Sequence, residues 1–169
     1  MSRYNVAIVG VTGMVGQAFI KILQERKFPV KGWKLLASSR SADKKIHIAG
    51  RDYTIEEARP DSFAGVDFAF FSAGGDVSQQ LAPEAVRRGA IVVDNSSAFR
   101  MDPEVPLVVP EVNAGAVSSH KGIIANPNCS TIQLVVALQP LHQAAGLKRV
   151  VVATYQSVSG AGKEAVDEL

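Results

Sequence analysis

The stretch YNVAIVGVTGMVGQAF, residues 4–19, decides the fold of this chain. It opens with an apolar run and continues with glycines at positions 10, 13 and 16. The pattern predicts a buried strand over 4–9, a tight turn, and a helix over 15–27 whose apolar residues recur at helical spacing. A strand, a glycine loop and a helix in this order are typical of the first unit of a dinucleotide-binding α/β sheet.

Each of the three glycines has its own expected role. Gly10 permits the tight turn, Gly13 lets a pyrophosphate approach the backbone, and Gly16 allows the helix to pack closely on the strand. The helix N-terminus adds free N–H groups and a partial positive charge. The spacing is G-x-x-G-x-x-G rather than G-x-G-x-x-G, so a glycine-rich turn without a ligand is the alternative. The strand–loop–helix context favours nucleotide binding.

The rest of the chain repeats this alternation of short apolar runs and amphipathic stretches, which predicts a parallel sheet covered by helices. We expect an α/β fold with a Rossmann-type, doubly wound, mainly parallel sheet, followed by the beginning of a second α/β (α+β) domain. The expected domains are 1–128 for nucleotide binding and 129–169 for an incomplete second domain. The expected elements are strands at 33–37, 66–71, 90–94 and 122–125, a hairpin over 45–55, helices over 76–89 and 130–145, and a long β-rich run over 147–158.

Prolines are expected to interrupt several of these elements. Pro83 predicts a break or a fresh first turn within the second helix. Pro103, Pro106 and Pro110 indicate an extended excursion between two strands.

Composition narrows the classes of function. The 169 residues are 47% hydrophobic and 20% charged, with a net charge of +2 and scattered Lys and Arg, so nucleic acid is not expected as a partner. A single cysteine excludes an internal disulfide and a multi-cysteine zinc site and suits a reducing compartment. No run approaches the ~20 apolar residues of a membrane span. We expect a cytoplasmic protein without a membrane partner or a metal.

The residues after the second strand bear on the choice of nucleotide. NAD binding favours an Asp or Glu there, which accepts from the ribose 2′-OH. This chain instead has Ser38, Ser39, Arg40 and Ser41, whose hydroxyls and guanidinium suit a 2′-phosphate. NADP is therefore the expected cofactor, and a solvated Arg40 without a ligand is the alternative.

The single cysteine, Cys129, follows an expected strand and the turn Asn126-Pro127-Asn128, and it stands at the start of a helix. A thiolate is stabilised there by free N–H groups and by the helix dipole, and a thiolate can attack an activated carbonyl. Asn128 and the turn N–H groups could donate to the resulting oxyanion. Free cysteines are also often buried and inert, but a polar βα loop favours a nucleophile.

Seven motifs in order resemble the aspartate-β-semialdehyde dehydrogenase family across essentially the whole chain. They are GVTGMVG, ASSRSADK, FFSAGG, VVDNSSAFR, VPLVVPEVN, NPNCSTIQ and TYQSVSGAGK. The resemblance implies an NADP-dependent enzyme that reduces L-aspartyl-4-phosphate to L-aspartate 4-semialdehyde, toward lysine, threonine, methionine and diaminopimelate. N-acetyl-glutamyl-phosphate reductase shares the architecture but is expected to have a Gly-Cys-Tyr type of thiol motif. A reductase for another acyl phosphate and a non-catalytic nucleotide-binding module remain the alternatives.

The resemblance also implies roles for individual residues. Cys129 would be the acyl-enzyme nucleophile. Gln156 would orient the substrate, and Arg100, with Asn95 and Asn128 nearby, would bind the phosphate group. A surface pairing of Arg100 with Asp102 is the alternative. The residues implied in contact with NADP are Gly10, Thr12, Gly13, Met14, Val15, Ser38, Ser39, Arg40, Ser41, Ser72, Ser159 and Gly160.

The resemblance finally implies that part of the catalytic machinery lies beyond residue 169. The family's acid–base histidine does not correspond to His47, His120 or His142, the last of which should lie ~15 Å or more from the thiol along its helix. The chain is therefore expected to be the N-terminal half of the enzyme, with little turnover alone. Aspartyl phosphate, the semialdehyde and phosphate are the implied small-molecule partners, and the parent enzyme is implied to be a homodimer or a dimer of dimers.

Overall fold

A seven-stranded sheet forms the centre of the molecule, which is a computed structural model that describes residues 3–161 and 163–169. The strand order is β3-β4-β2-β1-β5-β6-β7. All neighbouring strands pair in parallel except β3 and β4. The strands are β1 (Tyr4–Val9), β2 (Val30–Ala37), β3 (Lys45–Ile48), β4 (Arg51–Glu57), β5 (Phe68–Phe71), β6 (Ile91–Asp94) and β7 (Ile123–Ala125). The expected mainly parallel α/β sheet is confirmed.

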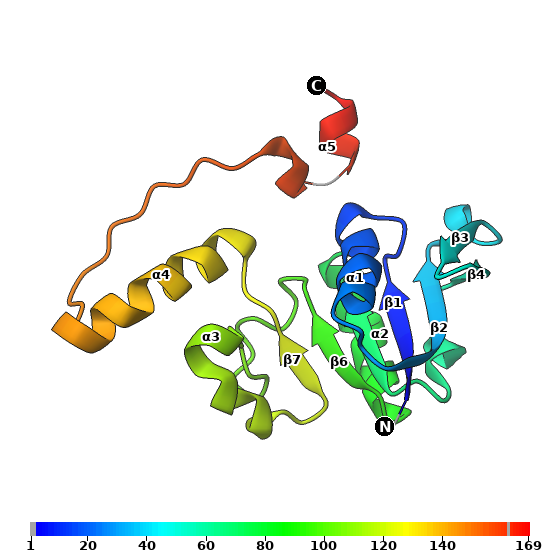
Figure 1. Ribbon diagram of the computed structural model, residues 1–169, viewed down its shortest axis with the longest axis horizontal. Coiled ribbons are helices and arrows are strands. Elements are labelled where there is room, and N and C mark those ends of the chain that lie inside the picture. Colours follow the sequence, from blue (N-terminus) through cyan, green and yellow to red (C-terminus); the bar gives the residue numbers. More distant parts are fainter. Residues whose placement is uncertain (1–2, 162) are drawn as a thin grey trace.

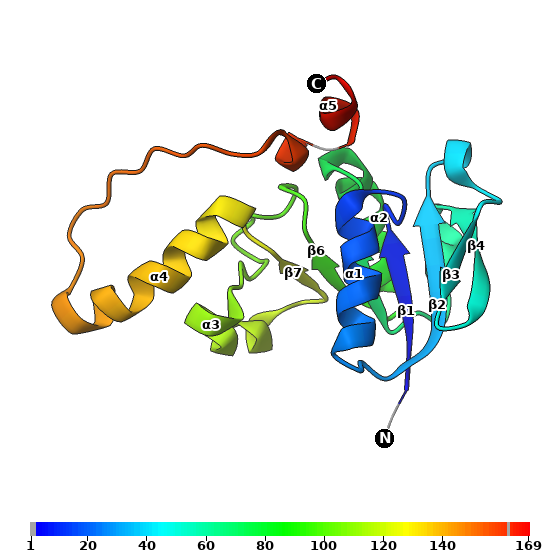
Figure 2. The same ribbon diagram turned by 45° about the horizontal axis from the view of Figure 1, so that its top comes forward.

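Helices cover both faces of this sheet (Figures 1 and 2). The α-helices are α1 (Met14–Glu25), α2 (Gly75–Arg87), α3 (Pro110–Asn113), α4 (Cys129–Ala145) and α5 (Lys163–Asp167). Ile20 of α1 packs with Val6 and Ile8 in one buried cluster. Leu81 of α2 packs in a second cluster with Ala7 and Val9. Because alternate β1 residues belong to different clusters, α1 and α2 lie on opposite faces, as in a doubly wound fold.

The strand order reverses at β1. From β1 the chain adds β2 and β4 on one side, and β5, β6 and β7 on the other. Ligands of open parallel sheets bind outside the carboxyl ends of the strands at such a switch point. The loops after β1 and β5 are therefore the expected place for a cofactor.

Two glycines hold the first turn of α1 against the end of β1. Gly10 has φ +85°, and a Cβ there would lie 2.3 Å from the carbonyl oxygen of Ser72. A Cβ on Gly16 would lie 2.3 Å from the Gly10 oxygen and 2.8 Å from Val11 Cα. Gly13 differs, because a Cβ there would meet only the Gly10 oxygen at 3.4 Å. The roles expected of Gly10 and Gly16, a tight turn and close packing, agree with these contacts.

A buried carboxylate joins β6 to α2 and to the loop that follows β6. Asp94 is fully buried, and its Oδ1 accepts from the Ser78 hydroxyl at 2.8 Å and from the Ser96 N–H at 3.1 Å. The Ser96 hydroxyl donates to the other oxygen at 2.7 Å. A buried carboxylate is tolerated when such donors replace water. The network fixes the start of the loop that carries Asn95 and Arg100.

The predicted hairpin is confirmed, with Gly50 between β3 and β4 in the left-handed region at φ +83°. β2 starts at Val30, earlier than predicted, and α1 ends at Glu25 rather than at 27. The predicted break at Pro83 is wrong, because α2 continues through it. The excursion after β6 is not wholly extended, since α3 and a 3₁₀ helix over Ala114–Ser119 lie within it.

The largest departure from prediction is the β-rich run before Ser159. Residues 146–157 form no strand and are exposed, with Val151 at 79% and Tyr155 at 101% of full exposure. Figure 1 shows this segment running from the end of α4 to α5 at a distance from the sheet. A strand needs a hydrogen-bonding neighbour, and none of the described strands lies beside it. Met1, Ser2 and Gly162, the last of which belongs to the motif TYQSVSGAGK, lie outside the described residues.

None of the helices in the described part of the chain has the length and apolar character required to cross a bilayer. Within residues 3–161 and 163–169, no three His, Cys, Asp or Glu side chains gather as a metal site would require.

The glycine packing predicts an unusual response to substitution. Gly16→Ala should lower the free energy of unfolding by about 1–2 kcal/mol, although alanine in a helix normally gains about 1 kcal/mol over glycine. The new Cβ meets backbone atoms, which cannot move aside as a side chain can. Urea unfolding measures the change. Gly13→Ala is the control, because a Cβ there meets only the Gly10 oxygen at 3.4 Å. Its loss should stay below about 1 kcal/mol, which is the usual effect of alanine at an N-cap. Equal losses in the two variants would contradict the packing role.

Candidate active site

The first cavity lies where the strand order reverses and is lined by the glycine loop. Its volume is about 490 Å³. The cavity brings together residues that follow β1, β2, β4 and β5, together with side chains from α2. They are Val9, Gly10, Thr12, Gly13, Ala37, Ser38, Ser39, Arg40, Glu57, Ala58, Ser72, Ala73, Val77, Gln80 and Leu81. We call this space the nucleotide pocket.

The backbone around the nucleotide pocket fits a dinucleotide. No side chain among the described residues caps the start of α1, and its first turn carries no acidic residue, so its N–H groups and dipole are available to an anion. Packing does not require glycine at position 13, since a Cβ there would find room. Two physical reasons for a glycine remain: its preference at the N-cap of a helix and a close approach of a ligand to the backbone.

The polar end of the nucleotide pocket follows β2. Ser39–Ser41 form a 3₁₀ turn, and Arg40 is exposed. Arg40 lines the pocket with Ser38 and Ser39. The described residues contribute no salt bridge to its guanidinium. A free guanidinium beside two hydroxyls can bind a phosphate.

The sequence-predicted cofactor residues fall into three groups. Gly10, Thr12, Gly13, Ser38, Ser39, Arg40 and Ser72 line the nucleotide pocket. Met14, Val15 and Ser41 lie beside it without lining it, and Ser159 and Gly160 line a different cavity. The sequence analysis did not single out Glu57, Ala58 or the α2 side chains of the pocket. A strand-end residue such as Glu57 could have been found only once β4 was known to lie beside β2.

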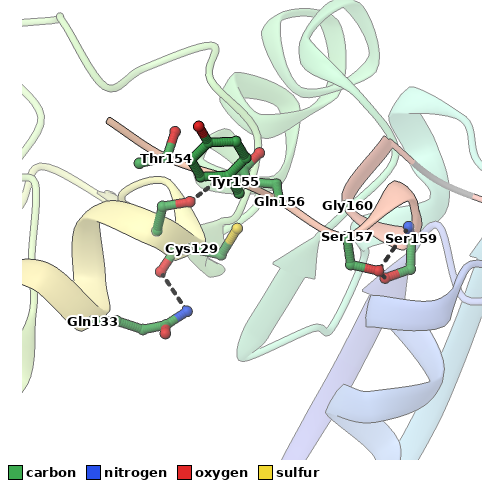
Figure 3. A pocket seen from close by; sticks show the side chains of 9 residues that line it. Cys129, Gln133, Thr154, Tyr155, Gln156, Ser157, Ser159 and Gly160 are labelled. Carbon is green, nitrogen blue, oxygen red and sulfur yellow. Dashed lines mark hydrogen bonds between the residues drawn. The ribbon is translucent and has the colours of Figure 1, made fainter. Parts of the chain in front are cut away.

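The second cavity surrounds the thiol and has a volume of about 390 Å³. Its lining joins the start of α4 to the segment that returns from its far end, and it comprises Cys129, Ser130, Gln133, Thr154, Tyr155, Gln156, Ser157, Ser159 and Gly160. Figure 3 shows Cys129 and Gln133 on α4 next to Thr154, Tyr155 and Gln156 of the returning segment, with Ser157 and Ser159 further along that segment. We call this space the thiol pocket.

Cys129 is the first residue of α4, and its side chain is exposed. Asn128 caps the helix, because its Oδ1 accepts from the Ser130 N–H at 3.0 Å. The buried Pro127 and the backbone bond from the Asn126 N–H to the Asp94 carbonyl at 2.8 Å hold the turn against the sheet. The sequence therefore places the only thiol in solvent at a helix N-terminus, where negative charge is stabilised.

Gln156 reaches the thiol pocket from the returning segment. Its Nε2 donates to the Ser130 hydroxyl, one residue after Cys129, and Figure 3 shows the Cys129 sulfur close to this contact. Gln133 lies one turn further along α4 and donates to the Cys129 carbonyl at 3.3 Å. The fold thus brings Cys129 and Gln156, which are far apart in the sequence, into one cavity.

Arg100 and two asparagines tie the loop after β6 to the loop after β7. Arg100 donates from Nε to the Asn126 carbonyl and from Nη2 to the Asn95 carbonyl, each at 3.0 Å. The Asn126 amide donates to Asn95 Oδ1 at 2.6 Å. The alternative pairing of Arg100 with Asp102 is not formed among the described residues. Arg100 is half-buried and held in one orientation beside the turn that precedes Cys129.

The two pockets share one edge of the sheet. The glycine loop follows β1, Ser72 follows β5, Asn95 follows β6, and Cys129 follows β7, and these strands are parallel. Parallel strands place their carboxyl ends on one side. The arrangement can therefore present a nucleophile and a dinucleotide from the same side of the molecule.

Comparison with known proteins agrees with this architecture. Residues 5–120 match the NAD binding domain of semialdehyde dehydrogenases, and residues 138–169 match the dimerisation domain of the same proteins. Aspartate-semialdehyde dehydrogenase from Bacillus subtilis strain 168 is 61% identical over 165 residues, which are 98% of this chain and 48% of that protein. The chain spans about half the length of the curated relatives it matches.

Two solved structures show the same fold. Aspartate semialdehyde dehydrogenase II from Vibrio cholerae, complexed with ASA, is 48% identical with a TM-score of 0.96, over 99% of this chain and 51% of that one. The Candida albicans enzyme with NADP is 31% identical with a TM-score of 0.74, over 86% and 48%. By the match over residues 5–120 and the agreement in fold, the chain belongs to the semialdehyde dehydrogenase family.

Proposed function

We propose that this chain carries the nucleophile and the cofactor loops of an NADP-dependent aspartate-semialdehyde dehydrogenase. The reaction reduces L-aspartyl-4-phosphate to L-aspartate 4-semialdehyde with release of phosphate, in amino-acid biosynthesis. The observation that carries the proposal is the exposed Cys129 at the start of α4, facing Gln156 on the sheet edge that also bears the glycine loop. The names of the most similar relatives support the choice of substrate.

Cys129 supplies the first step. Its thiolate, stabilised by the α4 N-terminus, attacks the acyl carbon of the substrate, a carbon–sulfur bond forms, and the carbon–oxygen bond to phosphate breaks. The amide group of Asn128 retains its N–H donors while Oδ1 caps the helix, so these donors are free to stabilise the oxyanion. When bound, the cofactor supplies the hydride that reduces the thioester carbon. The carbon–sulfur bond then breaks and restores the thiolate.

Gln156 and Arg100 position the substrate. The bond from Gln156 Nε2 to Ser130 leaves the Gln156 carbonyl oxygen as an acceptor for the substrate ammonium group. Arg100 uses Nε and Nη2 for backbone carbonyls and has further N–H donors for the leaving phosphate. Its fixed orientation would lower the entropy cost of binding that phosphate.

The relatives are about twice as long as this chain. We propose that the acid–base group for proton transfer lies in the part of the parent enzyme that corresponds to their other half. The described lining of the thiol pocket holds no histidine. His142 lies at the far end of α4, where its Nδ1 accepts from the Leu147 N–H at 3.2 Å.

The exposed Val151 and Tyr155 lie in the part that matches a dimerisation domain, which supports a homodimer or a dimer of dimers in the parent enzyme. The domain boundary at residue 129 stays a prediction.

NADP is the proposed cofactor within the nicotinamide class. Ser38, Ser39 and Arg40 offer two hydroxyls and a cation where an NAD site would hold a carboxylate. The structure of the Candida albicans relative with NADP supports this choice.

The thiol chemistry can be tested by trapping its covalent intermediate. Incubation with L-aspartate 4-semialdehyde and NADP⁺ without phosphate should leave an aspartyl thioester on Cys129, because the phosphate that would cleave it is missing. Mass spectrometry of the Cys129 peptide measures the adduct. Cys129→Ser and a sample without NADP⁺ should give none. An adduct of equal yield in Cys129→Ser would contradict the proposal.

The cofactor choice can be tested at Arg40. Arg40→Ala should weaken NADPH binding about tenfold while NADH binding changes little, because only NADPH carries the 2′-phosphate that the guanidinium would bind. Fluorescence titration gives both dissociation constants. Arg51→Ala, at an exposed position outside the pocket, is the control for the change in net charge. Equal weakening of both nucleotides would rule out recognition of the 2′-phosphate.

A further inference from the structure

A carboxylate lies in the wall of the nucleotide pocket. Glu57 is the last residue of β4, where it stands in register with Ala37 at the end of β2. The Ala58 N–H donates to the Ala37 carbonyl at 2.8 Å, which fixes the two strand ends side by side. Glu57 lines the same pocket as Ser38, Ser39 and Arg40. The neighbouring strand thus places an acid close to the position where β2 itself has none.

An unpaired carboxylate at this place would oppose the proposed cofactor. A 2′-phosphate carries negative charge, and like charges at short range cost binding free energy. The pocket nevertheless contains the serine and arginine group that suits such a phosphate. A nearby cation must therefore offset the negative charge of Glu57 if the pocket is to bind a 2′-phosphate.

Arg59 forms an ion pair with Glu57 and offsets its negative charge. Its Nε and Nη2 donate to the same oxygen of Glu57, Oε2, at 2.8 and 2.5 Å. Arg59 lines a neighbouring cavity with Asp61 and does not line the nucleotide pocket, whereas Glu57 is part of the wall of both. The hydrogen bond to Glu57 and the charge of Glu57 raise the pKa of Arg59.

The backbone holds this pair in place without using the Arg59 side chain. The Ser62 hydroxyl accepts from the Arg59 N–H at 3.1 Å and donates to the Glu57 carbonyl at 3.2 Å. Ser62 is itself buried, next to the buried Phe63. The turn should therefore survive removal of the guanidinium.

We propose that Arg59 determines the preference for a 2′-phosphorylated nucleotide by neutralising Glu57 in the wall of the nucleotide pocket. Arg59 is a positioning residue, because it acts through Glu57 rather than by touching the cofactor. Because Arg59 offsets the charge of Glu57, the Arg40 guanidinium in the pocket is left for the phosphate. The inference rests on the proposed NADP-dependent function and names the residues that set its cofactor choice.

The test is a double-mutant cycle of Arg59→Ala, Glu57→Gln and the two combined, with dissociation constants for NADPH and NADH from fluorescence titration. Arg59→Ala should weaken NADPH binding about fivefold and NADH binding less than about twofold. Glu57→Gln should not weaken NADPH binding. The double variant should return to within about twofold of the parent chain. Arg51→Ala is the matched control, and thermal unfolding followed by circular dichroism checks the fold of each variant.

Salt dependence supplies a second measurement. The loss of NADPH affinity in Arg59→Ala should shrink as the ionic strength rises from 0.01 to ~0.15 M, because an exposed unpaired carboxylate is screened. A loss that comes from altered packing would not change with salt and would not be rescued by Glu57→Gln. Either finding would overturn the proposal.

The outcomes separate this proposal from the proposed function. If the parent chain prefers NADPH and Arg59→Ala keeps the full preference, the role of Arg59 is wrong while the cofactor choice stands. If the parent binds both nucleotides alike but Arg59→Ala weakens NADPH alone, the role of Arg59 stands and the cofactor choice fails. Tighter NADH binding in Arg59→Ala with unchanged NADPH binding would make Glu57 a ribose ligand and overturn the proposal. Binding of neither nucleotide by the parent overturns both.

Discussion

The close backbone contact between Gly10 and Gly16 is the constraint on which the site depends. It brings the first turn of α1 against the end of β1 at a distance that a Cβ would not allow. The glycine loop then lies beside Ser72, and the nucleotide pocket forms where the strand order reverses. The identities of the lining side chains decide only what this space prefers to bind.

The fold was predictable where hydrophobic periodicity and glycine positions agree. The run at 4–9 and the hairpin around Gly50 are local patterns, and both form as expected. The run at 150–155 has equally strong β propensity, yet it remains exposed because no described strand lies beside it. At Pro83 the local pattern predicts a break, but α2 continues through it. The burial of Leu81, Ala82 and Ala85 against the sheet outweighs the local preference of proline.

The site was predictable at residues whose chemistry is local. Cys129 could be placed at a helix start because the turn and the cap lie next to it in sequence. Its neighbour Gln156 came only from a family resemblance. The buried bond between Ser78 and Asp94, and the position of Glu57 beside the β2 end, depend on strand order. Pairing between distant strands cannot be read from one sequence, so these polar contacts stayed hidden.

We propose that the nucleotide pocket and the thiol pocket form one active site at a shared edge of the sheet. It rests on parallel strands that bring the glycine loop and Cys129 to the same side. A crystal structure of the chain with NADP⁺ tests it most directly. We expect the pyrophosphate to lie on the start of α1 and the nicotinamide ring to contact Cys129. A nicotinamide ring directed away from α4, with no path to the thiol, would contradict it.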